Sequence, residues 1–450
     1  MNNEELNALF IEAVTDYNNK NFQQASEKFK VLLDYEPNNI VIWHNYGLSL
    51  ISQDRFEEAL VALELPIQKQ YSESILSRGA ALRSMGRYEE AMTEFSKCFI
   101  LNATNTKAYS NYGNCLREFG MPEAALPYFD IALNADPDDP TYKLNQSVAY
   151  LLKGDLINGW KNYDGRWFYQ SDVSFKPKLP GIEYDGTQDV AGKIVCVYCE
   201  QGFGDSIQFI RYVKILQEMG AKILLVTRPP LVDLFKYNFP DIEIRTEFNS
   251  LTYNFHVPLL DLPKCFNTSI DTIPYPTPYL SVSHSLIQSY KKLLGEKTKR
   301  RVGIVWSSNS IAFTTRFRQV SLELMLQKLS ECDVEIVNLK FDATTEEKEL
   351  LKKYNAICVD ADGFNNVAAL TMNLDLVVTV DTVHAHVAGA LGVPVYVMIA
   401  DYGMDWRWFL HRTDSPFYQS ATVFRQHGDR DWAPVLDDIN QKYRSEEHTS

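Results

Sequence analysis

Along the first third of the chain, small and bulky apolar residues recur at a spacing typical of paired helices. A glycine is followed twelve residues later by an alanine, and a bulky apolar residue comes four residues after that alanine. The order holds in three successive segments: Gly47, Ala59 and Leu63; Gly79, Ala91 and Phe95; Gly113, Ala125 and Phe129. The alanines lie 32 and 34 residues apart, and Ala25 precedes the first of them by 34. This period predicts stacked helix pairs, each of which buries its apolar face on the next.

The repeated pattern resembles the tetratricopeptide repeat. Four units begin near residues 6, 40, 72 and 106, and a degraded fifth begins near residue 140. In the fifth unit Gly159 replaces the alanine and Tyr163 replaces the bulky apolar residue. We therefore expect an α-helical solenoid over residues 1–165.

The sixth position of these units is polar, and it falls on the inner face of such a solenoid. It holds Asn45, Ser77, Asn111 and Asn145. A carboxamide donates to a peptide carbonyl and accepts from a peptide N–H, so a row of asparagines can hold an extended backbone. The row resembles the asparagine ladder of the eukaryotic O-GlcNAc transferases, which implies acceptor binding by Asn45, Asn111 and Asn145. Because asparagine is common at this position in such repeats, a purely structural role is the alternative.

Beyond residue 165 the helix pairs give way to alternating strands and helices. Strands are expected at 193–199 and 221–227, on either side of a helix at 206–219 that Gly220 ends. After residue 301 the pattern predicts strands at 302–306, 334–339, 357–359, 374–380 and 394–398, and helices at 322–329, 346–354, 364–372 and 387–392. Such alternation is typical of parallel sheets covered by helices. The expected fold class is α + α/β, with a linker at 166–189 and two Rossmann-like lobes at 190–290 and 300–440.

Two motifs follow predicted strands. Glu200-Gln201-Gly202-Phe203-Gly204-Asp205 does not match the dinucleotide fingerprint, but Gly202 and Gly204 allow close backbone approach where open α/β sheets bind ligands. Gly204-Asp205, with Asp381-Thr382-x-x-x-His386 before 388–394, resembles the signature of the family nine, heptosyltransferase-like glycosyltransferases of GT-B fold. The stretches 200–212 and 405–426 are similar to a bacterial subgroup in which tetratricopeptide repeats precede that unit.

The resemblance implies an inverting glycosyltransferase that uses a nucleotide-sugar as co-substrate and needs no metal or other cofactor. Repeat-bearing members are associated with protein acceptors, flagellin among them. Asp205 is implied as the general base, with Glu200 in reserve, and an N-cap for the following helix is its structural alternative. Asp381, Thr382 and His386 are implied to bind the donor at a helix start, where amides favour a diphosphate. A core histidine is the alternative for His386, and His384 matches no motif position.

The polar loop after the predicted strand at 302–306 is a further candidate for donor binding. Its cations can neutralise a leaving phosphate, and its candidate residues are Ser307, Asn309, Arg316 and Arg318. Heptosyltransferases place a lysine in this region, whereas loop 307–318 has none, so we expect Arg318, slightly before Arg316, to replace it. The missing lysine favours one alternative, a non-catalytic adaptor with a degenerate transferase unit. Another alternative, a transferase of the lipopolysaccharide core, is disfavoured because a small glycolipid needs no solenoid.

Three other patterns have weaker functional readings. Cys196 and Cys199 form a CxxC inside an expected buried strand, and no second pair completes a zinc site, so we expect no metal. Asp360-Ala-Asp362 is a DxD triplet, which binds metal and nucleotide in another glycosyltransferase fold but also arises by chance. Segment 405–408 carries two tryptophans that can stack a sugar or pack the lobe.

Composition narrows the partners and the compartment. The net charge is −14, with an acidic excess in the repeats, which disfavours nucleic acid and favours a neutral or basic protein. We expect no membrane span because no run approaches the roughly 18–20 apolar residues that one requires. The scattered cysteines and an N-terminus without a signal-peptide pattern favour a cytoplasmic protein. Residues 444–450 resemble a translated sequencing adapter, so we expect an artefact there and leave them out of the fold argument.

Overall fold

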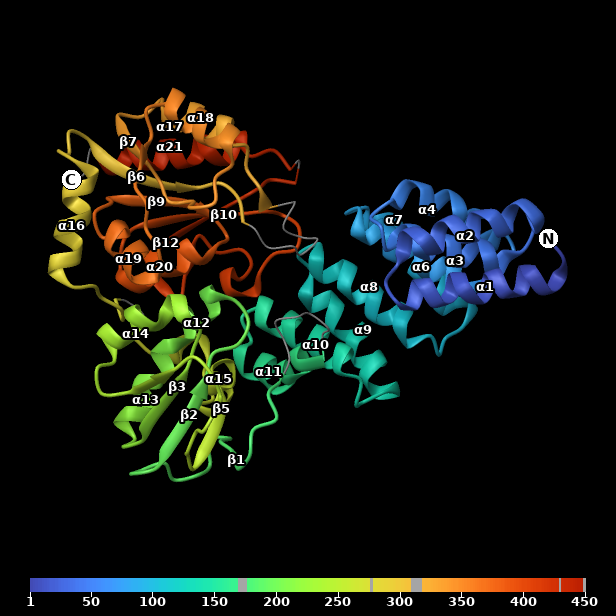
Figure 1. Ribbon diagram of the computed structural model, residues 1–450, viewed down its shortest axis with the longest axis horizontal. Coiled ribbons are helices and arrows are strands. Elements are labelled where there is room, and N and C mark those ends of the chain that lie inside the picture. Colours follow the sequence, from blue (N-terminus) through green and yellow to red (C-terminus); the bar gives the residue numbers. More distant parts are fainter. Residues whose placement is uncertain (169–175, 276–277, 309–317, 429, 448–450) are drawn as a thin grey trace. The chain divides into compact units, whose positions relative to one another are not determined.

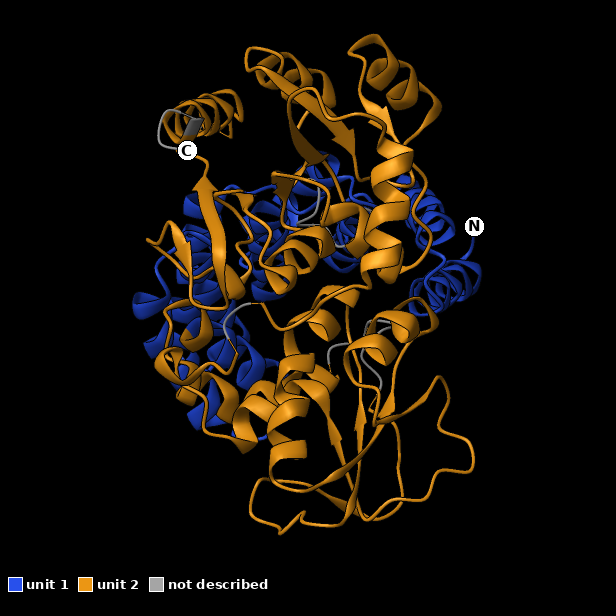
Figure 2. Ribbon diagram, turned by 90° about the vertical axis from the view of Figure 1, so that its left-hand side faces the viewer, with its two compact units in different colours: residues 1–149 blue, residues 150–450 orange. Residues whose placement is uncertain are grey.

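The computed structural model describes residues 1–168, 176–275, 278–308, 318–428 and 430–447. It divides into two compact units, residues 1–149 and residues 150–450 (Figure 2). The division falls inside the fifth helix pair, ahead of the boundary expected at residue 165. The second helix of that pair, α11 (Leu156–Lys161), belongs to the second unit.

The first unit consists of helices arranged as the repeat pattern predicts. They are α1 (Asn3–Asn18), α2 (Phe22–Tyr35), α3 (Ile40–Ile51), α4 (Phe56–Ala62), α5 (Glu64–Gln68), α6 (Ser72–Ser84), α7 (Tyr88–Leu101), α8 (Thr106–Glu118), α9 (Pro122–Ala135) and the first part of α10 (Pro140–Leu152). The second helix of the repeat that begins near residue 40 is split into α4 and α5. Pro66 explains the split, because its ring clashes with the carbonyl of Ala62, where α4 ends.

The glycines of the repeat explain how the two helices of each pair approach. A Cβ added to Gly79 would lie 2.5 Å from the Phe95 ring, and one added to Gly113 would lie 2.8 Å from the Phe129 ring. A Cβ added to Gly47 would lie 2.7 Å from the Leu63 side chain. The pattern of glycine and bulky residue therefore marks one tight contact that is repeated from unit to unit.

The second unit contains two sheets with helices between and around the strands (Figure 1). The first sheet has the order β1-β5-β2-β3-β4, and its paired strands are all parallel. Its strands are β1 (Ile182–Glu183), β2 (Ile194–Tyr198), β3 (Lys222–Val226), β4 (Glu243–Arg245) and β5 (Phe255–Pro258). Its helical segments include α12 (Phe203–Phe209), η2 (Ile210–Tyr212), α13 (Val213–Glu218), α14 (Val232–Asn238) and α15 (Leu262–Cys265). The next helix, α16 (His284–Leu294), lies beside the second sheet and packs against α19 (Phe364–Thr371) (Figure 1).

The second sheet has the order β11-β12-β10-β9-β6-β7-β8, and only the β11–β12 pair is antiparallel among its described strands. Its strands are β6 (Arg300–Val305), β7 (Val334–Asn338), β8 (Ile357–Cys358), β9 (Leu376–Val380), β10 (Val395–Ile399), β11 (Asp414–Ser415) and β12 (Tyr418–Arg425). Its helices are α17 (Leu322–Leu329), α18 (Thr345–Lys353), α19 (Phe364–Thr371), α20 (Val383–Leu391) and α21 (Ala433–Glu447). Helix α21 therefore includes the first residues of the segment 444–450.

Alternate residues of this sheet divide it into two covered faces. One face packs Ile304, Val378 and Met398 against apolar residues of α17, α18 and α21. Helices α19 and α20 lie on the opposite side, and α20 packs against α12, which follows β2 of the first sheet (Figure 1). Helices on both faces are the arrangement that strand–helix alternation predicts. The contact between α12 and α20 brings the loops after β2 and β9 together.

Two expectations for the first sheet need correction. The predicted helix 206–219 begins earlier, at Phe203, and passes through the 3₁₀ segment η2 before it ends at Glu218. Gly220 follows with a φ of 85°, as expected for a residue that ends a helix. The expected linker 166–189 contains the 3₁₀ segment η1 (Tyr163–Phe168) at its start and strand β1 near its end.

Candidate functional site

A cavity of about 680 Å³ lies where strands of both sheets end. The segment after β2 contributes Gly202, Gly204 and Asp205 to its wall, and the segment after β9 contributes Asp381 and Thr382. The loop after β6 adds Ser307, and Arg318, His386, Asp405 and Arg407 complete its polar lining together with the loop after β7. Carboxyl ends of parallel strands are where open α/β sheets bind ligands. Asn309 and Arg316 lie outside the described residues.

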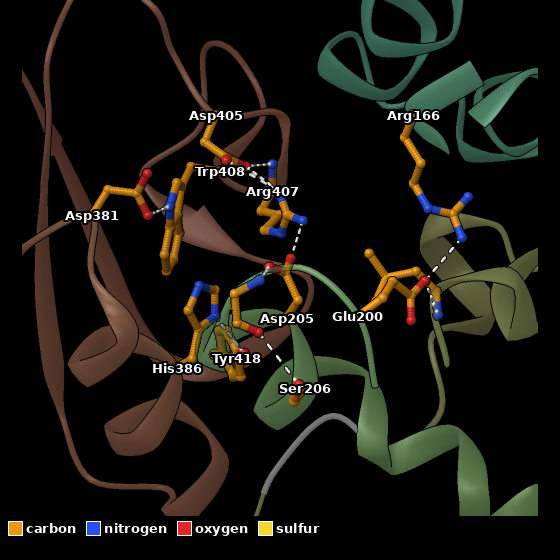
Figure 3. A network of polar contacts seen from close by, with 12 residues as sticks. Arg166, Glu200, Asp205, Ser206, Asp381, His386, Asp405, Arg407, Trp408 and Tyr418 are labelled. Carbon is orange, nitrogen blue, oxygen red and sulfur yellow. Dashed lines mark hydrogen bonds and ion pairs between the residues drawn. The ribbon is translucent and has the colours of Figure 1, made fainter. Parts of the chain in front are cut away.

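Asp205 is held in place by two hydrogen-bond donors. Its Oδ2 accepts the backbone N–H of Gly202 at 2.8 Å, and its Oδ1 pairs with the Arg407 guanidinium (Figure 3). Asp205 is the third residue of α12, and Gly202 is the N-cap of that helix. The capping role expected for Asp205 is therefore present in a modified form, since the side chain reaches back to the cap residue. Residues 202–204 form the start of a helix and not an extended glycine loop.

Arg407 joins Asp205 to a second carboxylate. Its Nη1 lies 2.9 Å and 3.0 Å from the two carboxylate oxygens of Asp405. Although burial alone would lower it, the charges of Asp205 and Asp405 raise the pKa of Arg407. Burial opposes ionisation of Asp405, but Arg407 and Arg318 outweigh it and lower the pKa of that carboxyl. The three side chains form a network of ion pairs at one wall of the cavity, in which Arg407 is buried and the two aspartates are partly exposed.

Asp381 accepts hydrogen bonds from two side chains of the second sheet's loops. Trp408 Nε1 donates to its Oδ1 at 2.8 Å (Figure 3). Arg318 Nη1 lies 2.7 Å from its Oδ2. Burial raises the pKa of Asp381, with Asp405 adding to the rise and Arg318 opposing it. Arg318 also donates to the Gly403 carbonyl, and its side chain remains 24% exposed. Arg318 is thus the more accessible of the two arginines that line the cavity among the described residues.

His386 is fixed on two sides. Its Nδ1 lies 2.8 Å from the Tyr418 hydroxyl, and its ring stacks on Trp408 with centroids 5.7 Å apart. The residue is 5% exposed, and burial lowers its pKa to about 4. The imidazole is therefore neutral near pH 7. Its edge meets Gly204, where an added Cβ would lie 2.6 Å from His386 Cδ2, so the glycine of one motif and the histidine of the other form a single contact.

Thr382 is the N-cap of α20, and its hydroxyl oxygen accepts the backbone N–H of His384 at 3.3 Å. The same hydroxyl lies 2.9 Å from Thr379 Oγ1. His384 lies one residue into the helix and lines the cavity too. Sequence reasoning ranked His384 low because no motif position corresponds to it.

The structure also brings a lysine to the cavity, from a segment that sequence reasoning did not consider. Lys340 follows β7 and lines the cavity, with Nζ 2.9 Å from Asp342 and 3.4 Å from Glu347. Its charge lies 5.4 Å from the centroid of the Trp306 ring. Loop 307–318 has no lysine, but Lys340, more than twenty residues later in the sequence, brings one to the same cavity. A polar residue directly after a predicted strand is the signal that could have identified it.

Charges on the cavity wall are matched within the described residues. The cations are Arg318, Lys340 and Arg407, and the carboxylates are Asp205, Asp342, Asp381 and Asp405. Each of these cations makes an ion pair with at least one of these carboxylates. An anionic ligand that binds to one of these side chains therefore competes with a carboxylate for it, whereas the start of α20 offers backbone N–H groups without such competition.

Glu200 lies in a separate network and not on the described wall of the cavity. Its Oε1 accepts from Arg166 Nη2 at 2.9 Å, and the same guanidinium nitrogen lies 2.8 Å from Asp261 (Figure 3). Burial raises the pKa of Glu200 to about 7, against the charge of Arg166 and with the charge of Asp261 adding to the rise. Arg166 thus forms ion pairs with both carboxylates. This arrangement favours a structural role for Glu200 over its reserve role as the base.

Each of the three asparagines at the sixth repeat position forms a hydrogen bond through one end of its side-chain amide. Asn45 Nδ2 donates to the Val41 carbonyl, Asn111 Oδ1 accepts from Arg83, and Asn145 Nδ2 donates to Ser110 Oγ. All three side chains are half-buried, and the other end of each amide makes no hydrogen bond within the described residues. Peptide binding by this row stays a prediction.

The remaining motifs occupy structural positions. Cys196 and Cys199 are free, and Cys196 is buried in β2. Asp360 and Asp362 line a smaller apolar cavity of about 340 Å³ next to α19. Trp406 and Trp408 are buried at 4% and 1% exposure, so they pack the fold and cannot stack a ligand without rearrangement. No group of three or more potential metal ligands occurs within the part of the chain that the structure describes.

Comparison with known proteins supports the repeats in the first half of the chain, and one similar protein aligns with most of its length. Residues 72–105 match the family model of the tetratricopeptide repeat. The chain is 23% identical over 437 residues to Protein FlbA of Caulobacter vibrioides, which covers 89% of this chain and 72% of that protein. It is 23% identical over 129 residues to Tetratricopeptide repeat protein 6 of Homo sapiens, which covers 28% of this chain and 25% of that protein.

Solved structures similar to this chain align with about a third of it. MamA of Desulfovibrio magneticus is 14% identical and covers 35% of this chain and 90% of its own, with a TM-score of 0.32. A thermophilic repeat protein of Thermus thermophilus is 16% identical and covers 35% and 88%, also with a TM-score of 0.32. Residues 72–105 thus carry a tetratricopeptide repeat, in a chain that has a further α/β region and is similar to FlbA. In the ranges that the structure covers, no helix has the length and apolar character of a membrane span.

Proposed function

We propose that this protein is an inverting glycosyltransferase of GT-B architecture, which transfers a sugar from a nucleotide-sugar to a protein acceptor that the repeats present. The observation that carries the proposal is the shared cavity. Asp205 from the first sheet and Asp381, Thr382 and Arg318 from the second line one space at the carboxyl ends of parallel strands. These residues are far apart in sequence, and the motif resemblance implies complementary roles for three of them: Asp205 as the base, and Asp381 and Thr382 as donor-binding residues.

Asp205 is the general base in this proposal. It takes the proton of the acceptor hydroxyl as that oxygen attacks the anomeric carbon and the nucleotide leaves with the bonding electrons. Its oxygens already accept from Arg407 and Gly202, but each carboxylate oxygen offers about two lone-pair sites. Arg407, held by Asp405, therefore orients the base without filling its capacity to accept a hydroxyl.

The donor's phosphates belong on the opposite wall of the cavity. Helix α20 begins there, and the partial positive charge of a helix N-terminus favours a phosphate by about 0.3–1 kcal/mol at an exposed site. Arg318 is partly exposed and bound to Asp381, whose raised pKa favours uptake of a proton as a phosphate approaches. Arg318 is then released to stabilise the leaving group.

One observation favours a second function, a repeat adaptor whose α/β unit no longer turns over. Every cation on the described cavity wall is already paired with a carboxylate there. A site that no longer binds an anion needs no unpaired positive charge, so its remaining cations would pair with the neighbouring carboxylates. This function predicts that nucleotides neither bind nor react.

The test is a transfer assay on the full chain. Radiolabelled UDP-, GDP-, ADP- and CMP-sugars are incubated with the protein and a cell extract, and both label on protein and release of nucleotide are measured. We expect one donor to be consumed, and Asp205→Asn to lower the rate by about 10²–10⁴-fold, the usual contribution of a general base.

Asp233→Asn is the matched control, because Asp233 is also a first-turn carboxylate, in α14, and does not line the cavity. Its rate should equal that of the unaltered protein. A folded protein that consumes none of these donors would refute the transferase and support the adaptor.

A further inference from the structure

A small cavity next to the candidate site has apolar walls and an acidic rim. It has a volume of about 340 Å³ and is lined by Pro230 of η3 (Pro229–Leu231) and by the start of α19. Phe203 and Phe341 line both this cavity and the 680 Å³ cavity, so the two cavities adjoin. Phe203 lies in the first turn of α12, two residues before Asp205. A group bound in the smaller cavity is therefore a neighbour of the carboxylate proposed as the base.

The walls of this cavity offer apolar contacts to a long side chain. Phe364 and Val367 of α19 line it together with the two phenylalanines, and Phe364 lies 5.0 Å from Phe203 between ring centroids. Phe341 is 68% exposed, so its ring remains open to a ligand. Aliphatic groups that leave water for such a surface are stabilised in proportion to the apolar area that they bury.

Among the described residues that line this cavity, the only charges are negative. They belong to Asp360 and Asp362 of the DxD triplet, both of which are exposed. Their backbone carbonyls accept from Tyr290 and Asn366, but neither carboxylate makes a hydrogen bond or an ion pair within the described residues. The rim thus carries two carboxylates that no described side chain neutralises.

These carboxylates suit an organic cation better than a metal ion. No third potential ligand joins them to form a metal site in the part of the chain that the structure describes. Asp360 also lines a cavity of about 590 Å³, whose wall carries Lys348 and Lys352. Asp362 lines neither of the other two cavities, so it is the carboxylate that is specific to the small one.

We propose that the 340 Å³ cavity binds a lysine or arginine side chain of the acceptor polypeptide, with the aliphatic stem on the apolar walls and the charge at Asp362 and Asp360. The inference rests on the transferase function proposed above, and it names the acceptor class: a segment with a basic residue near the modified hydroxyl. Lysine and arginine bury their stems while their charged ends stay at the surface, and an aromatic ring such as Phe341 attracts a cation further.

Charge at longer range favours the same partner. The adjoining 680 Å³ cavity is lined by three cations and four carboxylates, so its wall adds no excess of positive charge. The net charge of the chain is −14. Such a surface attracts a basic segment and repels an acidic one before either makes contact.

The experiment is binding of synthetic peptides to the full chain, measured by fluorescence anisotropy without a donor. Each labelled peptide carries one serine in a neutral, glycine-rich sequence, and lysine, arginine, norleucine or glutamate takes successive positions on either side of it. Norleucine keeps the apolar stem of lysine but lacks its charge. The variants are Asp362→Asn, Asp360→Asn combined with Asp362→Asn, and Phe341→Ala. The control is Asp241→Asn, which changes an exposed carboxylate that lines none of the three cavities.

The variants separate the charge from the apolar contact. We expect the best lysine and arginine peptides to bind roughly 3- to 30-fold more tightly than their norleucine counterparts, with a smaller preference at high salt. Asp362→Asn should reduce that preference by up to about fivefold, and the double variant should reduce it further, while norleucine peptides bind as before. Phe341→Ala should weaken lysine and norleucine peptides alike, and Asp241→Asn should change neither.

The failure of this inference can be told apart from that of the transferase function. Equal binding of lysine and norleucine peptides, or a preference that the aspartate variants leave unchanged, overturns the basic subsite and leaves the transferase function standing. A preference that follows these variants, in a protein that consumes no sugar-nucleotide, overturns the transferase function and the acceptor role, while the basic subsite stands. With an active donor, Asp362→Asn should raise the KM of the best peptide and leave kcat unchanged.

Discussion

The contact between Gly204 and His386 predicts that Gly204→Ala lowers the stability of the unaltered protein but raises that of a His386→Ala variant. Gly204 lies in the first turn of α12, and its backbone carries no left-handed strain. Replacing it with alanine would by itself favour the helix by about 0.5–1 kcal/mol. In this fold, however, the new methyl group would meet the edge of the His386 ring.

The structure sets the size of the opposing effect. The added Cβ would lie 2.6 Å from Cδ2 and 3.2 Å from Nε2 of His386, whereas carbon atoms in contact prefer about 3.5–4.0 Å. The ring cannot yield easily, because the Tyr418 hydroxyl holds Nδ1 and Trp408 covers its face. Overpacking of this kind costs about 1–3 kcal/mol. We therefore expect Gly204→Ala to destabilise the protein by roughly 0.5–2 kcal/mol after the gain in helix propensity.

The assay is a double-mutant cycle followed by thermal unfolding. Tryptophan fluorescence reports mainly the second unit, because every tryptophan except Trp43 lies within it. Each kcal/mol should shift the midpoint by about 2–4 °C. In the His386→Ala background the obstacle is gone, so Gly204→Ala should raise the midpoint there while it lowers it in the unaltered protein.

The reasoning fails if the two substitutions are additive. Independent sites add within about 0.3–0.5 kcal/mol, whereas the predicted coupling is about 1–3 kcal/mol. Additive midpoints would mean that α12 and α20 do not make this contact in solution. The pairing of the two motifs in one cavity would then lose its support.

Three further predictions concern stability elsewhere in the chain. Glu200 has a pKa of about 7 when folded against 4.5 otherwise, so the folded state binds the extra proton and loses stability as pH rises between these values. Glu200→Gln should therefore gain stability relative to the unaltered protein from pH 5 to pH 8, and an unchanged difference in urea midpoints would contradict this. Gly79→Ala should destabilise the repeats by about 1–3 kcal/mol through the Phe95 ring, and circular dichroism melts that show no loss of stability would contradict this contact. Trp406→Ala should cost about 3–5 kcal/mol because the ring is buried among aromatic neighbours, and a midpoint shift below 2 °C would speak against that packing.

The sequence predicts elements well where one periodic signal dominates. Helix α17 has the predicted bounds, and β2, β7 and β10 lie within one residue of expectation at most of their ends. The repeat glycines were correctly identified as close contacts, since each meets the bulky residue of its own unit. The edge strands β1 and β11 were not predicted, because each has only two residues and neither continues a strand–helix alternation that could mark it, as the alternation marks β8.

The site was predicted in part, and the reason lies in how its residues are brought together. Asp205, Asp381, Thr382 and His386 belong to local motifs after strands, so their neighbourhood could be inferred from topology. Lys340 also comes directly after a predicted strand, which marks it as a candidate, but its place beside the loop after β6 depends on β6 and β7 being neighbours in the sheet. Arg407 escaped for a similar reason, since only the fold brings it to Asp205.

The aromatic packing around α11 has a consequence for where the chain can be cut. Trp160 lies 5.3 Å from Trp406 and 6.0 Å from Phe209 between ring centroids, and Tyr163 also faces Trp406. A shortened chain that starts at residue 166 would lack Trp160 and Tyr163, expose the Trp406 and Phe209 rings that they contact, and favour aggregation. Repeat arrays should therefore be exchanged between relatives at a junction before α11, because this helix supplies Trp160 to the hydrophobic core of the second unit.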